Sequence, residues 1–326
     1  MAIFISLLLT IGGLALLAKM TDIFVDGASS IAKHLRVSAT VIGLTIVAFG
    51  TSAPEFFIAL TSRISGSGST DIAMGNIVGS GVLRILLILG LAAVIRPIRV
   101  QSAVSKRELP LLILTTCAFV ATFLDQILDS AAANAFSRID AIMMLLIFGI
   151  FIYYLRMIIL HRRAIQDVDN IDAIADARFT KKQAIFAVIG GLIGLIIGAQ
   201  LTVAGATAVA EGLGMSERVI AITIIGIGTS LPELLVAAVA AKRGEGTLAI
   251  GSIIGANIFN IGFVIALPTL IFGGFSVASF SYVDLGMMLI AVFLLALFST
   301  SDRKIQRSEG LAMLIIFTLY MIYLII

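Results

Sequence analysis

A short motif that occurs twice decides the fold of this chain. Residues 50–55 read GTSAPE, and residues 228–233 read GTSLPE. At this spacing the two parts of the chain also match upstream of the motif, without a gap. Downstream, after a two-residue deletion, residues 75–80 (GNIVGS) align with residues 251–256 (GSIIGA). The chain is therefore predicted to be an internal duplication.

The composition around these motifs is that of a membrane protein. The chain has 326 residues, of which 60% are hydrophobic and 13% are charged, and its mean hydropathy is +1.15. A soluble domain has about a quarter of its residues charged. The low charge content excludes nucleic-acid binding as the reason for the pI of about 9.1. The single cysteine, Cys117, excludes a disulfide framework and a cysteine metal cluster.

Apolar runs divide the chain into membrane spans. A helix rises about 1.5 Å per residue and must cross about 30 Å of hydrocarbon. We predict an all-α polytopic membrane protein with ten transmembrane helices, at about residues 2–18, 39–62, 70–94, 108–124, 139–155, 184–207, 219–241, 247–271, 281–298 and 310–326.

Basic residues indicate the orientation of these spans. With the N-terminus outside, eighteen Lys and Arg residues fall in inner loops, against three in outer loops, namely Arg63, Arg138 and Arg218. Cytoplasmic loops carry the excess of positive charge. We therefore expect a multi-pass protein of the cell membrane with both termini extracytoplasmic.

The duplication divides the chain into two repeats. Residues 1–155 are predicted to form a first repeat of five helices, residues 156–183 a cytoplasmic linker, and residues 184–326 a second repeat of five helices. Because five is odd, the second copy enters the membrane from the opposite side. This is the inverted architecture of many secondary transporters.

The repeated motif combines features that are costly inside a membrane. Proline leaves a carbonyl one turn back without its helical donor, glycine loosens the same turn, and Thr and Ser add hydroxyl groups. Glu55 and Glu233 add negative charge beside these oxygens. Two such turns facing each other would form the oxygen cage that a hard cation requires.

The helix after each motif is rich in glycine, and its Gly-x-x-x-Gly spacing lets two helices approach closely. We expect it to bring polar side chains near the cage, namely Asn76, Ser80, Ser252, Asn257 and Asn260. The glycines at 190, 191, 194 and 198 are predicted to serve helix packing.

These two motifs, in this order and each present twice, resemble the alpha repeats of the sodium/calcium exchanger (cation/calcium antiporter) superfamily, in its prokaryotic calcium/sodium antiporter type. The resemblance covers the whole chain and implies exchange of Ca2+ for Na+. The transported Ca2+ and Na+ would be the only ligands besides membrane lipid, with no resident cofactor, no nucleic acid and no protein partner that can be inferred.

The resemblance also implies roles for individual residues. Glu55 and Glu233 would be the central ligands of Ca2+ and Na+, and Thr51 and Thr229 would lend backbone carbonyls to Ca2+. The flanking Na+ sites would be formed by Ser52, Ser230, Ser80 and Asn260, with the carbonyls of Ala48 and Gly226.

Two residues depart from the pattern of the superfamily. Where many members have a second asparagine, this chain has Arg84, and Ala256 replaces a hydroxyl-bearing residue. Together with Asn76 and Asn257, Arg84 would modify the site. Arg84 is expected deep in its helix, where its charge either pairs with the two glutamates or extends along the helix to an interface.

Several functions remain open from the sequence. Exchange of Ca2+ for Na+ by alternating access is the leading interpretation. A proton-coupled or other cation exchanger is the second, and a homologue whose transport is impaired by Arg84 is a further alternative. An intramembrane enzyme is the least favoured, because the spans contain no His, Cys or paired-Asp constellation.

Overall fold

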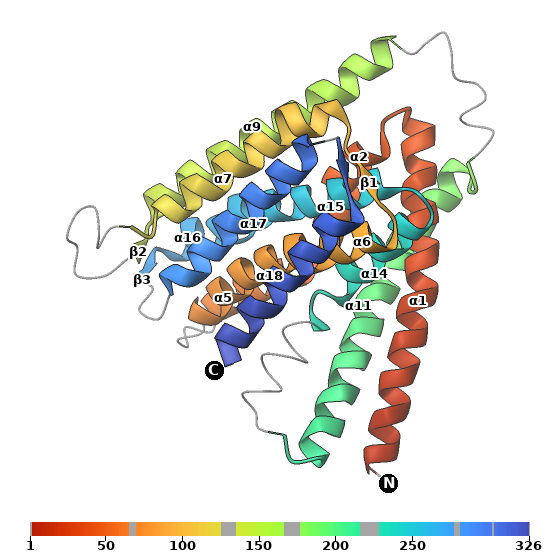
Figure 1. Cartoon of the computed structure of the whole chain (residues 1–326), viewed down its shortest axis with the longest axis vertical. Helices are drawn as coiled ribbons and strands as arrows, with labels where there is room; N and C mark the ends of the chain where they lie inside the picture. Colours follow the sequence, from red (N-terminus) through yellow and green to blue (C-terminus); the bar gives the residue numbers. More distant parts are fainter. Residues whose placement is uncertain are drawn as a thin grey trace.

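The computed structural model describes residues 2–64, 70–124, 135–165, 177–215, 228–276, 281–301 and 303–325, and these residues are mainly helical (Figure 1). The elements of the first half are α1 (Ala2–Leu35), α2 (Ala39–Ile42), the π-helix η1 (Gly43–Val47), α3 (Ala48–Thr51), α4 (Ala53–Ile64), α5 (Thr70–Leu83), the π-helix η2 (Arg84–Leu89), α6 (Gly90–Ile95), β1 (Ile98–Arg99), the π-helix η3 (Val104–Glu108), α7 (Leu109–Ala121), β2 (Ala135–Phe136) and α9 (Arg138–Ile165). Those of the second half are α11 (Lys181–Gly212), α14 (Leu231–Lys242), α15 (Gly246–Phe259), the π-helix η5 (Asn260–Val264), α16 (Ala266–Phe272), β3 (Phe275–Ser276), α17 (Tyr282–Thr300), β4 (Lys304–Ile305) and α18 (Arg307–Ile325).

The helices confirm a multi-span membrane protein. Within the described residues, seven helices are long and apolar enough to cross a membrane, and a bent pair, residues 39–51 with residues 53–61, is a possible eighth. The predicted spans at residues 108–124 and 219–241 contain the shorter helices α7 and α14, of 13 and 12 residues. Residues 216–227 lie outside the described part, so the total of ten spans stays a prediction.

The first helix is longer than the predicted span of residues 2–18. The start of the prediction agrees with the structure, but its end at residue 18 was wrong. Helix α1 continues to Leu35 and has 34 residues, about 50 Å at 1.5 Å per residue. No proline or glycine pair interrupts its second half. The helix ends where Arg36 adopts a left-handed conformation (φ 56°) and the Val37 N–H donates to the Ala32 carbonyl at 3.0 Å, as in a Schellman motif.

Helix α1 packs antiparallel along α11, and small residues set this contact (Figure 1). A Cβ atom on Gly13 would lie 2.8 Å from the carbonyl oxygen of Gly198 and would also meet Thr202. A Cβ atom on Gly191 would lie 2.9 Å from that of Phe24. The two contacts are equivalent. When the two copies of the motif are aligned, Gly191 corresponds to Gly13 and Thr202 to Phe24, so each glycine meets the same position of the other copy.

The predicted packing role is confirmed for three of the four glycines of α11. Gly191, Gly194 and Gly198 all lie against α1. It was wrong for Gly190, whose Cβ position has no described atom within 4 Å. Gly190 is on the exposed face of the helix, since adjacent helical positions point about 100° apart.

The helix that carries the first motif crosses the centre of the molecule against α15. A Cβ atom on Gly43 would lie 2.5 Å from the Leu248 carbonyl oxygen, and one on Gly255 would lie 2.6 Å from the Leu44 carbonyl oxygen. Only glycine permits this approach of the two backbones. Helix α15 is itself almost wholly buried, so it forms the core next to the motif.

Two short antiparallel sheets join the two halves of the chain. Strand β1 pairs with β4, with Ile98 opposite Ile305, and β2 pairs with β3, with Phe136 opposite Phe275. The two sheets lie far apart (Figure 1). Each one therefore fixes a loop of the first half to a loop of the second half at its own end of the molecule.

Candidate functional site

Both copies of the motif have a non-helical serine directly before the start of a helix. Helix α3 ends at Thr51, Ser52 is non-helical (φ −87°, ψ 4°), and α4 begins at Ala53 with Pro54 in its first turn. Ser230 is likewise non-helical (φ −97°, ψ 7°), and Pro232 lies in the first turn of α14. Proline is tolerated there because first-turn N–H groups have no intrahelical acceptor.

The motif places an acid in the first turn of each of these helices. Glu55 lies in the first turn of α4 and Glu233 in the first turn of α14. Their exposed fractions are 2% and 6%. The positive end of a helix dipole faces each carboxylate, which offsets part of the cost of burying the charge.

Several oxygens of this region have no hydrogen-bond donor within the described residues. They are the hydroxyls of Ser52 and Ser230 and the second carboxylate oxygens, Oε2, of Glu55 and Glu233. All four side chains are buried. An unsatisfied buried polar group costs about 1–3 kcal/mol. Four of them at two matched turns mark a place where a ligand can supply the missing interactions.

Arg84 lies between the two acids, at the start of η2. Its side chain is fully buried, its Nη2 donates to Glu55 Oε1, and the same nitrogen lies 3.4 Å from Glu233 Oε1. The predicted pairing of Arg84 with the two glutamates is confirmed. The alternative, in which the side chain extends to an interface, was wrong, because four buried groups hold the guanidinium inside.

The other two of these groups are Ser80 and Asn260. Arg84 Nη1 donates to Ser80 Oγ at 2.9 Å. With the Asn260 amide oriented so that its oxygen faces the guanidinium, Oδ1 accepts from Nη1 at 2.7 Å and from Nη2 at 3.1 Å. One guanidinium thus joins α4 and α5 of the first half of the chain to α14 and η5 of the second half.

Other predicted site residues are bonded within their own helices. Thr51 Oγ1 donates to the Val47 carbonyl at 3.0 Å, and the Ala48 carbonyl accepts the Ser52 N–H at 3.1 Å. The Ala48 carbonyl also accepts from the Thr51 hydroxyl at 3.5 Å, so both of its lone pairs already face donors.

The second glycine-rich helix shows the same behaviour. Asn257 Nδ2 donates to the Ile253 carbonyl at 2.9 Å, and Ser252 Oγ donates to the Ala249 carbonyl at 2.8 Å. Neither residue has a described bond to Arg84. Asn76 and Thr229 are half-buried, and Gly226 lies outside the described residues.

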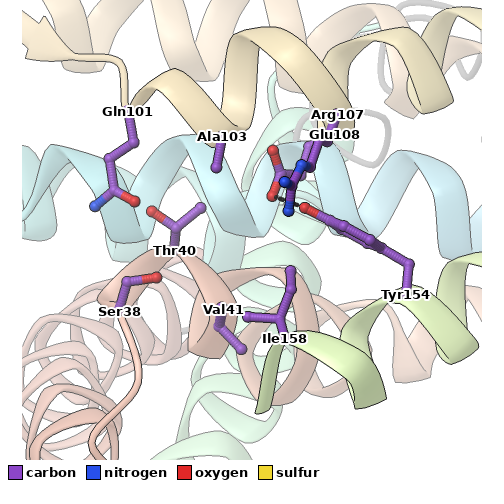
Figure 2. Close-up of a pocket in the computed structure, with 9 residues that line it drawn as sticks. All are labelled: Ser38, Thr40, Val41, Gln101, Ala103, Arg107, Glu108, Tyr154 and Ile158. Carbon is purple, nitrogen blue, oxygen red and sulfur yellow. Dashed lines mark hydrogen bonds between the residues drawn. The ribbon is translucent and has the colours of Figure 1, made fainter. Parts of the chain in front are cut away.

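A third buried acid, Glu108, was not anticipated from the sequence. It lines a cavity of about 200 Å³ with Tyr154, Thr40 and Gln101 (Figure 2). Tyr154 OH donates to Glu108 Oε1 at 2.5 Å, whereas Glu108 Oε2 and Thr40 Oγ1 have no partner in the described structure. In the sequence Glu108 follows Lys106 and Arg107 at the edge of an apolar run, which is also the pattern of an interfacial charge.

Comparison with known proteins identifies the family. The model of the sodium/calcium exchanger protein family matches residues 5–157 and 183–326. The CaxA protein of Alkalimonas amylolytica is 38% identical, over 94% of this chain and 95% of its own length. The sodium/calcium exchanger MaX1 of Methanosarcina acetivorans is 30% identical, over 98% of both chains. The solved structure of the sodium-calcium exchanger NCX_Mj superposes with a TM-score of 0.80 at 33% identity, over 97% of both chains.

The chain belongs to the sodium/calcium exchanger family. This confirms the resemblance that was inferred from the two repeated motifs. Members of this family are antiporters, and this supports cation antiport as the general activity of the chain.

Proposed function

We propose that this chain is a secondary antiporter of the cell membrane that exchanges Ca2+ for Na+ by alternating access, without a resident cofactor. The names of its relatives support both ions, since MaX1 is a sodium/calcium exchanger and NCX_Mj was examined with Na+ and Sr2+, a divalent cation of the same group as Ca2+. The composition, with long apolar helices around a few buried polar groups, supports a carrier with an internal site.

The observation that carries the proposal is the pair of matched turns at the starts of α4 and α14. Each turn leaves one carboxylate oxygen and one serine hydroxyl buried without a described donor. Hard cations such as Ca2+ and Na+ bind oxygen ligands of this kind. We assign the central ligand role to Glu55 and Glu233, and flanking roles to Ser52, Ser230, Ser80 and Asn260 with the carbonyls of Thr51, Thr229, Ala48 and Gly226.

The packing of α1 against α11 supports an arrangement of two inverted repeats, at residues 1–155 and 184–326. Related residues of the two copies meet reciprocally, as Gly13 with Thr202 and Gly191 with Phe24. Antiparallel contact between the first helices of two copies is what a pseudo-two-fold axis in the membrane plane produces. One repeat's bundle would rock against the other's around the central site.

Transport by the purified protein in proteoliposomes tests the function. We expect an outward Na+ gradient to drive uptake of radioactive Ca2+, and K+ or H+ gradients of the same size to drive none. Uptake driven by the H+ gradient alone would contradict the proposal and favour the proton-coupled exchanger.

Variants of the two acids test the site. Glu55→Gln and Glu233→Gln are each expected to reduce Na+-driven Ca2+ flux at least about tenfold, since each removes one of two charges that attract the cation. Both should remain folded, because glutamine keeps the shape of the side chain. Glu211→Gln, at the exposed end of α11, is the matched control and should transport normally. Near-normal flux in both site variants would refute the assignment.

A further inference from the structure

The central site already contains a positive charge that belongs to the chain. Arg84 contacts Glu55, Glu233, Ser80 and Asn260, and all four are among the side chains assigned above as cation ligands. The guanidinium therefore lies among the side chains that would surround a transported ion. An arginine guanidinium keeps its positive charge in proteins.

A count of charges shows what the guanidinium changes. Glu55 and Glu233 together carry −2 when both are ionised, and Arg84 reduces the total to −1. Without the arginine, two monovalent cations would neutralise the pair of acids. With it, one is enough. Because an uncompensated charge deep in the membrane is costly, the neutral loaded form is the one expected to change orientation most readily.

We infer that Arg84 is a resident cation of the transport site and replaces one Na+ in each cycle. This inference rests on the proposed Ca2+/Na+ exchange. The chain would then move one Na+ fewer per Ca2+ than the same site without an arginine. Ca2+, for its part, would enter a site of charge −1 and compete with the guanidinium for Glu55.

The geometry explains why the arginine remains in place. Ser80 is one helical turn before Arg84, so its hydroxyl accepts from Nη1 on the same face of the helix. Asn260 and the two glutamates bind the guanidinium from three other elements. Extending the side chain to an interface would leave both acids buried without this partner, which is strongly destabilising for a buried ion pair.

The second repeat supplies the matched substitution. In the alignment of the two copies, Asn260 corresponds to Arg84 and Ala256 to Ser80. The first copy thus places a cation where the second places an amide. Arg84→Asn gives both copies the same residue and removes the charge, whereas Arg84→Lys keeps the charge on a different donor.

The test measures the number of Na+ ions exchanged per Ca2+. In proteoliposomes, the Na+ gradient and membrane potential at which net Ca2+ flux is zero give this ratio independently of the transport rate. We expect the ratio of the wild-type protein to be lower by one than that of Arg84→Asn, and Arg84→Lys to keep the wild-type ratio. Equal ratios in wild type and Arg84→Asn would overturn the inference.

A binding measurement separates the inference from the proposed function. Na+-dependent thermal stabilisation of the purified protein reports how many Na+ ions the folded state binds, whether or not Ca2+ is transported. We expect one more bound Na+ in Arg84→Asn, and Ca2+ binding about 100-fold tighter or more, because a fixed positive charge close by has been removed.

Each combination of results has a distinct meaning. Absence of Na+-driven Ca2+ flux in wild type and all variants refutes the proposed exchange, and the Na+ count then decides the inference alone. Ca2+ transport by Arg84→Asn only would refute the proposed exchange for the wild-type protein, and the Na+ count would again decide the inference alone. If Arg84→Asn does not fold, Arg84→Gln provides the uncharged variant, and an unchanged Na+ count in it overturns the inference.

Discussion

At the scale of single residues, the candidate site differs from the rest of the interior because the buried serine hydroxyls at its two matched turns have no hydrogen-bond partner among the described residues. Buried Thr21, Thr202 and Thr269 each donate to a carbonyl one turn back in their own helix. Ser52 and Ser230 have no such bond among the described residues, and each has non-helical backbone angles directly before a helix. Their hydroxyls are therefore free for a ligand.

This difference predicts that Ser52→Ala and Ser230→Ala weaken Na+ binding without lowering the stability of the protein. Removing a buried hydroxyl without a partner relieves a cost of about 1–3 kcal/mol, so the midpoint of thermal unfolding should stay constant or rise. The Na+ concentration for half-maximal flux should rise about tenfold, if each hydroxyl contributes about 1.4 kcal/mol to binding. Unfolding can be followed with a thiol-reactive dye, since Cys117 is the one cysteine of the chain.

Ser252→Ala is the control for this pair. Ser252 is also buried, but its hydroxyl donates to the Ala249 carbonyl within α15. We expect normal Na+ dependence in this variant. An equal loss of Na+ affinity in Ser252→Ala and Ser52→Ala would show that the two matched turns do not define the site.

The pairing of Arg84 with Glu55 and Glu233 was one of two alternatives that the sequence left open, since position 84 lies deep in a helix where no other acid is available. The sequence did not predict that Asn260 would hold the guanidinium while Asn257 would not. The two asparagines are three residues apart and chemically identical. Which of them faces Arg84 depends on how η5 packs against η2, and no local pattern encodes this.

At the scale of elements, hydropathy predicted where helices exist but not their local geometry. Residues 43–47, 84–89 and 260–264 form π-helices within otherwise α-helical spans. A π-helical segment accommodates an extra residue per turn and is frequently found at functional sites. Arg84 and Asn260, which bond to each other, are the first residues of two of them. The change of helix type cannot be read from a run of apolar residues, because it depends on contacts between helices.

The contact between α1 and α11 predicts different effects of alanine at adjacent glycines. Gly13→Ala and Gly191→Ala place a Cβ atom against the partner helix at distances below 3 Å, so the helices must separate. We expect each to lower the unfolding midpoint and the transport rate. At Gly12 and Gly190 no described atom lies within 4 Å, and alanine is a better helix former by about 1 kcal/mol.

Gly12→Ala and Gly190→Ala are therefore the internal controls and should be neutral or stabilising. Each control is adjacent to its test position, so a general effect of alanine in this region would appear in all four variants. Equal destabilisation by Gly190→Ala and Gly191→Ala would contradict the described packing.

At the scale of the whole molecule, ion pairs join residues that the distribution of Lys and Arg assigns to the same side of the membrane. Arg243 donates to Asp22 and Asp26, and Arg178 donates to Asp26 at 2.6 Å. All of them belong to predicted inner segments. Nearby, burial raises the pKa of the Glu245 carboxyl, which accepts a hydrogen bond from Ser29 at 2.9 Å.

The two small sheets follow the same division. Strands β1 and β4 belong to predicted inner loops, and β2 and β3 belong to predicted outer loops. Arg63, one of the three basic residues assigned to the outside, donates to the Gly273 carbonyl beside β3. The two sheets and the Arg63 hydrogen bond each join loops that are predicted on one side of the membrane. They do not determine which side is cytoplasmic. The excess of Lys and Arg indicates the side of β1 and β4.

Helix α11 offers a direct test of this orientation. Its 32 residues span about 48 Å, longer than the hydrocarbon core, so its two ends must project on opposite sides of the membrane. Lys182 at one end and Glu211 at the other are both exposed. In a Cys117→Ser background, we expect an impermeant maleimide to label Glu211→Cys in intact cells and Lys182→Cys only after permeabilisation. Because both positions lie on one helix, differences in expression or folding cannot mimic the result. Rapid labelling of Lys182→Cys in intact cells, with Glu211→Cys protected, would place the linker outside and both termini in the cytoplasm.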